Sequence, residues 1–129
     1  MAVVMLPHAP ASAAVARHRL VEGLSALGIQ SEVITDAELV ITEMVGNAVR
    51  HARPLPDGQL RAGWELEDDR VVLRVTDGGG ETRPIVARQD DFEAERGRGL
   101  AIVAALARDW GSERDDAGLQ IWAALDLTR

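Results

Sequence analysis

The chain has 129 residues, of which 47% are hydrophobic, and a formal net charge of −7 at neutral pH. This length and composition suffice to bury one hydrophobic core, so we expect a single domain over residues 1–129. The lack of cysteine excludes disulfides and cysteine-ligated metal sites. The acidic balance argues against binding to nucleic acid or anionic lipid, because both need clustered cations.

The N-terminal residues 1–7 lack the basic segment of a signal peptide, and their apolar run is too short for one. No later apolar run approaches the roughly 20 residues that a membrane-spanning helix needs. We therefore expect a cytoplasmic protein without membrane association.

In chain order, the first expected element is a short edge strand at residues 3–6. A helix is predicted over residues 12–27 and a second from residue 31 or 32 to 52, because apolar residues recur in both at helical spacing. Gly28 and Pro54 are typical of residues that end helices. The apolar stripes comprise Ala13, Ala16, Leu20, Leu24 and Leu27, then Ile34, Ala37, Ile41, Met44, Ala48 and Ala52.

Two strands are predicted next, at residues 59–67 and 71–77, joined by a turn at 67–70. The first alternates polar and apolar residues, the pattern of a sheet with one solvated face. A third helix is predicted over residues 99–110, apolar almost all round and therefore buried. A final hairpin follows over residues 111–127. This order predicts an α+β fold, a two-layer sandwich with helices packed on one face of a mostly antiparallel sheet.

Asp77 is the first candidate functional residue. It continues the inward-facing row of the strand at 71–77, where a carboxylate needs a partner because burying an unpaired charge is costly. Three glycines follow at 78–80, and glycine allows a backbone to approach a flat ligand closely. The alternative is an ordinary Asp-Gly turn at the end of a strand.

Glu43 and Asn47 are four residues apart, so they share one side of the second helix, and His51 extends the row. A glutamate can accept a proton, and an asparagine side-chain oxygen can ligate a hard cation such as Mg²⁺. The alternative is a solvated Glu-Asn pair beside a surface histidine.

Residues 96–100, Arg-Gly-Arg-Gly-Leu, open the third helix. Glycines there expose the free N–H groups of a helix start, where the helix dipole favours an anion. The motif is neither a dinucleotide fingerprint nor a P-loop, because Ile102 stands where a third glycine belongs and no Gly-Lys-Ser/Thr occurs.

Each feature suits a different part of one nucleotide: the acid with glycines suits adenine, the Glu-Asn row Mg²⁺ and a reacting hydroxyl, and the helix start phosphates. Residues 43–47 resemble the N box of GHKL ATPases, the group that holds type II topoisomerases, histidine kinases and mismatch-repair ATPases. Residues 75–79 resemble the first glycine box and residues 97–103 the second. The chain is most similar to the anti-sigma-factor serine kinases of this group, which residues 46–52 and 121–123 also resemble.

The resemblance implies the Bergerat ATP-binding fold, with ATP and Mg²⁺ as cofactors. It implies that Glu43 is the catalytic base, that Asn47 is the Mg²⁺ ligand and that Asp77 contacts adenine. The phosphate side of the nucleotide site would be formed by Gly79, Arg96, Gly97, Arg98, Gly99 and Leu100.

The resemblance implies a serine/threonine protein kinase that phosphorylates an anti-sigma-factor antagonist or sequesters a sigma factor. The alternative is a non-catalytic nucleotide-binding module that controls a partner protein. Glu43 favours the kinase. Two departures favour the module. Glu81 stands where the first glycine box usually has glycine, and Gly118-Leu119-Gln120 stands where the last strand often carries threonine near adenine. Gln120 can still form a hydrogen bond, though with a different geometry.

Two further expectations concern the lid and assembly. Residues 80–96 form a long, acidic segment between the adenine side and the phosphate side, and we expect it to close over the nucleotide. Trp122 falls on the wetter face of the last strand, which together with the family's dimers suggests a homodimer. The alternative is a tryptophan half-covered by a neighbour in its own chain.

Overall fold

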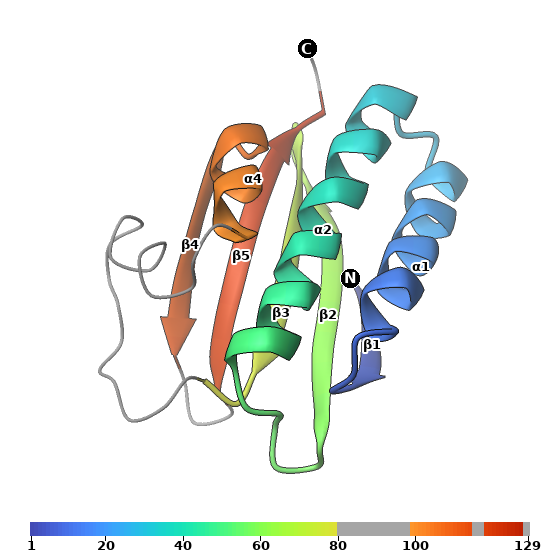
Figure 1. Ribbon diagram of the computed structural model, residues 1–129. Coiled ribbons are helices and arrows are strands. Elements are labelled where there is room, and N and C mark those ends of the chain that lie inside the picture. Colours follow the sequence, from blue (N-terminus) through green and yellow to red (C-terminus); the bar gives the residue numbers. More distant parts are fainter. Residues whose placement is uncertain (80–98, 115–117, 128–129) are drawn as a thin grey trace.

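The computed structural model describes residues 1–79, 99–114 and 118–127. Five strands form one sheet in the order β1-β2-β3-β5-β4, and each pair of neighbouring strands is antiparallel. The strands are β1 (Ala2–Pro7), β2 (Gln59–Glu67), β3 (Arg70–Asp77), β4 (Asp109–Arg114) and β5 (Leu119–Asp126). The helices α1 (Ser12–Ala26), α2 (Ser31–His51) and α4 (Gly99–Leu106) pack on one face of the sheet (Figure 1). The predicted α+β two-layer sandwich is confirmed.

The core lies between the helices and the inward-facing rows of the strands. One such row crosses the whole sheet through paired residues, namely Ala2, Trp64, Leu73, Ala123 and Trp110. The stripes predicted for α1 and α2 are buried at their centres, where Leu20, Leu24, Ile41 and Met44 have no solvent exposure. Leu27 was predicted to be part of the first stripe, but it lies beyond the last turn of α1 and is exposed.

The prediction for the third helix was wrong in its length and in its burial. The helix ends at Leu106 rather than at Trp110, because the N–H of Arg108 already donates to the carbonyl of Ala124 across the sheet, at 2.9 Å. Trp110 is therefore a buried residue of β4. Gly111, the residue after the predicted helix, lies in β4 opposite Trp122.

The surface of α4 that points away from the sheet is exposed, including Ile102 and several alanines. Only Leu100 and Val103 turn fully into the core, since α4 packs on the sheet and on α2 along one side. Within the described ranges, no helix combines the length and the apolar character needed to cross a membrane.

Candidate functional site

Asp77 ends β3 with its side chain fully buried, in line with the core residue Val75. Its Oδ1 accepts a hydrogen bond from the backbone N–H of Gly79, at 2.6 Å. Gly79 has a φ of +87°, a conformation that favours glycine, so the chain turns back toward the carboxylate. The two interpretations of Asp77 thus coexist: the carboxylate is inward-facing and also closes an Asp-Gly turn.

Two backbone hydrogen bonds connect the segment that follows α2 to the turn at residues 77–79. The N–H of Arg53 donates to the carbonyl of Gly79 at 2.9 Å, and the N–H of Gly78 donates to the carbonyl of Arg53 at 2.7 Å. The fold therefore holds the C-terminal end of α2 against the end of β3. Two of the three features predicted from sequence are in this way brought to one place.

Asn47 is completely buried on α2, four residues before its last residue. Within the described part of the chain, neither Oδ1 nor Nδ2 of Asn47 has a hydrogen-bond partner. Buried side-chain amides are nearly always paired, and leaving one unsatisfied costs about 1–3 kcal/mol. An amide held in this way is available to a ligand, and its oxygen fits one coordination position of Mg²⁺.

Glu43 lies four residues before Asn47 on α2, where its side chain is 27% exposed. Its Oε2 is 3.9 Å from Nη2 of Arg50. Asn47 is thus the buried residue of this pair, and Glu43 is the partly exposed one. His51 ends α2 and is exposed.

The start of α4 completes the candidate site. Gly99 is its first residue, Leu100 is fully buried, and α4 packs against α2. In Figure 1, α2 and β3 end toward the bottom of the view, and α4 begins at its lower end. Arg96, Gly97 and Arg98, together with Glu81 and the predicted lid at residues 80–96, lie outside the described residues.

A family model described as a histidine kinase-like ATPase domain matches residues 6–125, nearly the whole chain. The chain belongs to this family. The serine-protein kinase RsbW of Listeria innocua serovar 6a is 29% identical to it over 77 residues, which cover 59% of this chain. That alignment spans 49% of the kinase, about half of its length.

Two solved structures share the fold. The RsbU and RsbW domains of Rv1364c from Mycobacterium tuberculosis align over 98% of this chain and 32% of that chain, with a TM-score of 0.66 and 21% identity. The histidine kinase AdeS of Acinetobacter baumannii aligns over 100% of this chain and 69% of that chain, with a TM-score of 0.51 and 14% identity. At these identities the likeness establishes the fold of the ATPase domain.

Gln120 lies in β5 beside Leu119. Its Nε2 lies 3.4 Å from Oγ1 of Thr76, its cross-strand partner. Gln120 faces away from the buried row of Leu119, Ile121 and Ala123. The residue beside Asp77 on the helix-facing side is Leu119, which is buried. Gln120 therefore does not share the helix-facing side of the sheet with Asp77, whereas Leu119 does.

Trp122 lies on the same outer face as Gln120, as predicted, and is half-buried. A Cβ atom built on Gly111 would be 3.2 Å from the Trp122 ring, so the indole lies directly over the glycine backbone. The half-covered environment of Trp122 is thus explained within one chain. The homodimer stays a prediction.

Sequence reasoning missed three residues that shape the site, namely His8, Arg53 and Gly118. Gly118 has a φ of +153°, and a Cβ there would lie 2.0 Å from the carbonyl oxygen of Asp77. A lone glycine before a strand signals a close backbone approach, and that signal was present in the sequence. No sequence pattern marks His8 or Arg53, because their contacts join segments more than 20 residues apart.

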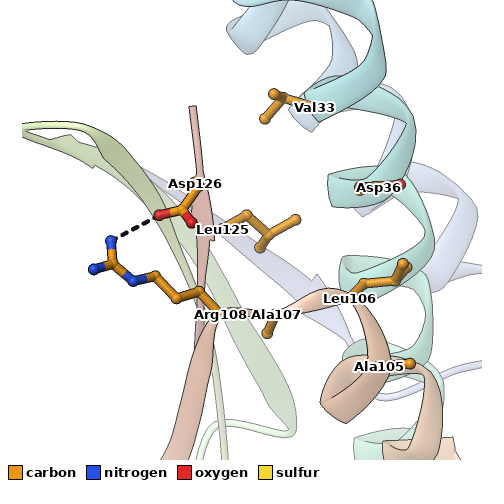
Figure 2. A pocket seen from close by; sticks show the side chains of 8 residues that line it. All are labelled: Val33, Asp36, Ala105, Leu106, Ala107, Arg108, Leu125 and Asp126. Carbon is orange, nitrogen blue, oxygen red and sulfur yellow. Dashed lines mark hydrogen bonds and ion pairs between the residues drawn. The ribbon is translucent and has the colours of Figure 1, made fainter. Parts of the chain in front are cut away.

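A separate cavity of about 330 Å³ lies between α2, α4 and the end of β5 (Figure 2). Its walls include Val33, Leu106 and Leu125, and the ion pair between Arg108 and Asp126, 2.8 Å long, lies at its edge. The hydrogen bond to Asp126 raises the pKa of the Arg108 guanidinium above its usual value. None of the residues predicted to bind nucleotide lines this cavity, so it is distinct from the candidate site.

Proposed function

We propose that the chain is an ATP-binding regulatory protein kinase. In this proposal it binds Mg·ATP between α2, the Asp77 turn and the start of α4. It then transfers the γ-phosphoryl group to a serine or threonine of an anti-sigma-factor antagonist, or sequesters a sigma factor. The observation that carries the proposal is the buried amide of Asn47, which has no hydrogen-bond partner among the described residues. Asn47 lies four residues after Glu43, on the helix whose end is hydrogen-bonded to the Asp77 turn. The similarity to a serine-protein kinase supports the class of activity.

Adenine recognition is assigned to Asp77. A carboxylate has two oxygens with about four lone-pair positions, so it can accept the Gly79 N–H and an exocyclic amine at the same time. Full burial strengthens such a bond, because water competes less for the carboxylate. Gly78 and Gly79 themselves add no side chain to this side of the site.

Mg²⁺ and phosphate binding are assigned to α2 and the start of α4. Asn47 Oδ1 would supply one ligand to Mg²⁺, which usually takes few protein ligands and completes its shell with phosphate oxygens and water. When bound, the cation offsets negative charge on the transferring phosphoryl group. The backbone N–H groups of Gly97 and Gly99, with Arg96 or Arg98, are proposed to hold the phosphates, and Leu100 anchors the helix start in the core.

Glu43 is proposed as the catalytic base. It is partly exposed on the same side of α2 as Asn47, so a hydroxyl of a docked protein can reach it. The proton of that hydroxyl passes to the Glu43 carboxylate as the hydroxyl oxygen bonds to the γ-phosphorus. The bond from this phosphorus to the bridging oxygen breaks in the same step, and ADP leaves.

A non-catalytic nucleotide-binding module is the second candidate. It is favoured by Leu119, which places an aliphatic side chain next to Asp77 where a hydroxyl would strengthen adenine recognition. In that case nucleotide binding would shape a surface for a partner protein without phosphoryl transfer.

Calorimetry with ATP and ADP tests the binding that both candidates share. Asp77→Asn should weaken binding by about tenfold or more, since a hydrogen bond to a charged group contributes about 1.5–3 kcal/mol. Chelation of Mg²⁺ should weaken ATP binding more than ADP binding. If neither nucleotide binds at millimolar concentration, both candidates are wrong.

Labelled ATP and an antagonist protein from the native host separate the two candidates. A kinase transfers label to the antagonist, and Glu43→Gln abolishes transfer while ATP binding persists. A binding module transfers no label with either protein, although both bind ATP.

A further inference from the structure

His8 lies in the loop between β1 and α1 and is partly buried. Its Nε2 is 2.8 Å from the carbonyl oxygen of Ala52 and 3.2 Å from that of Ala48. Carbonyl oxygens only accept hydrogen bonds, so Nε2 must carry a hydrogen and donate to both. Ala52 is the C-cap residue of α2, so its carbonyl has no partner within the helix, and the imidazole supplies one at the end of the final turn.

From this turn, the contacts continue without a gap to the adenine side of the candidate site. The N–H of Ala52 donates to the carbonyl of Ala48 at 3.1 Å, and Ala52 is followed by Arg53. Arg53 is bonded through both of its backbone groups to the Gly78–Gly79 turn, and the N–H of Gly79 donates to Asp77. The imidazole thus lies at one end of a connected set of hydrogen bonds, and the Asp77 carboxylate lies at the other.

The same turn of α2 also carries Asn47, which immediately precedes Ala48. The backbone of the His8 loop is itself well held. The buried hydroxyl of Ser12 donates to the carbonyl of Pro7 at 2.5 Å, and the N–H of Ala9 donates to the same carbonyl at 2.9 Å. His8 therefore projects from a fixed loop, and it can hold the end of α2 in one place.

We propose that His8 is a positioning residue for nucleotide binding. Its imidazole keeps the last turn of α2 and the Gly78–Gly79 turn in one arrangement, so that Asn47 and Asp77 keep the separation that a bridging nucleotide requires. The inference rests on the proposed function, because it assigns His8 a role in that same site. Helix ends fray when their carbonyls lack partners, and a site that is ordered for only part of the time binds more weakly in proportion.

Hydrogen exchange of three backbone amides tests the positioning without any nucleotide. In His8→Ala, the amides of Ala52, Arg53 and Gly78 should exchange faster than in the wild type, whereas amides in the centre of β3 should not change. His8→Gln should restore slow exchange, because its side-chain nitrogen is as many bonds from Cβ as Nε2 of histidine. The matched control is His18→Ala, which removes an exposed histidine from α1.

Calorimetry with ATP in the presence of Mg²⁺ tests the consequence for binding. His8→Ala should bind ATP about two- to tenfold more weakly, the range expected for the loss of one hydrogen bond. His8→Gln and His18→Ala should bind within twofold of the wild type. Thermal unfolding of the same proteins shows whether weaker binding only follows from a less stable fold.

Three results would overturn the inference. One is unchanged exchange at the three amides in His8→Ala. Another is faster exchange spread over the whole sheet, which would make the role of His8 purely structural. The third is faster local exchange with unchanged ATP affinity. If the wild type binds no nucleotide, the proposed function fails together with the binding part of this inference, while exchange still decides whether His8 holds the end of α2.

Discussion

Gly78 lies so close to Pro54 that a Cβ atom built on it would stand 2.1 Å from the Pro54 carbonyl oxygen. The neighbouring backbone bonds between Arg53 and the Gly78–Gly79 turn depend on this approach. The requirement for glycine at position 78 is therefore steric, and it comes from the chain that leaves α2. No ligand needs to be invoked to explain it.

Gly78→Ala should accordingly destabilise the protein and damage the candidate site. The obstructing atom is backbone, so the chain must shift, and overpacking of this kind costs about 1–3 kcal/mol. Urea unfolding should show a lower midpoint with an unchanged slope, and ATP binding should weaken further than stability alone explains.

Gly46→Ala is the matched control for this prediction. A Cβ there would come within 3.0 Å of Nη1 of Arg50, the far end of a flexible side chain that can move aside. Alanine in a helix interior is favoured over glycine by about 0.5–1 kcal/mol, so this variant should be as stable as the wild type or more stable. A Gly78→Ala protein as stable as Gly46→Ala would contradict the prediction.

Asn47→Leu should stabilise the ligand-free protein and abolish Mg²⁺-dependent ATP binding. The substitution replaces a buried amide without a described partner by an apolar side chain of similar size, which removes a penalty of about 1–3 kcal/mol. Thermal unfolding without nucleotide and calorimetry with Mg·ATP measure the two effects. A less stable variant that still binds Mg·ATP would show that Asn47 is a structural residue.

The fold followed from the sequence because its long elements carry clear patterns. The helical stripe of α2 and the alternation of β2 placed Met44 and Trp64 in the core correctly. The end of α4 did not follow, since residues 107–110 contain neither glycine nor proline to end a helix. Cross-strand pairing of Trp110 with Ala123, a long-range contact, decides the outcome there.

Less of the candidate site followed from the sequence. Asp77 could be identified because strand alternation turns it inward and glycines follow, and Asn47 because its spacing from Glu43 places both on one side of a helix. The outward facing of Gln120 followed from strand alternation, but nothing in the sequence showed that Leu119 pairs with Asp77. His8 could not be found, since its hydrogen bonds to Ala48 and Ala52 span 40 and 44 residues of sequence.

The pairing of Leu119 with Asp77 leads to a prediction about adenine recognition. Leu119→Thr places a hydroxyl beside Asp77 on the helix-facing side, where it can join the hydrogen bonds to an adenine base. We expect ATP affinity to rise by about two- to tenfold, the range of one additional hydrogen bond. Some loss of stability should accompany it, because a buried aliphatic side chain is removed.

Gln120→Thr is the control for this change, since it adds the same hydroxyl on the opposite face of the sheet. Its ATP affinity should equal that of the wild type. Calorimetry measures the ATP affinity of both variants. A gain in affinity for Gln120→Thr alone would show that the outer face contributes to adenine binding.

The edge strand β1 offers a surface through which the predicted homodimer could form. This strand contains no charged residue, and Val3 and Met5 are 50% and 41% exposed on it. The opposite edge strand, β4, carries Asp109, Glu113 and Arg114. Charged side chains on an edge strand discourage pairing with another chain, and β1 lacks this protection. In a protein with a net charge of −7, an uncharged edge is also where two copies repel each other least.

We therefore predict that two copies of the chain associate through β1 and that Met5→Lys separates them, because the lysine places a charge on each of the two paired edges. Val15→Lys adds the same charge at a similarly exposed apolar residue of α1 and should leave the dimer intact. Light scattering at micromolar concentration, with and without Mg·ATP, measures the mass of each protein. A monomeric wild type under both conditions would contradict the dimer. A dimeric Met5→Lys protein would show that the copies pair through another surface.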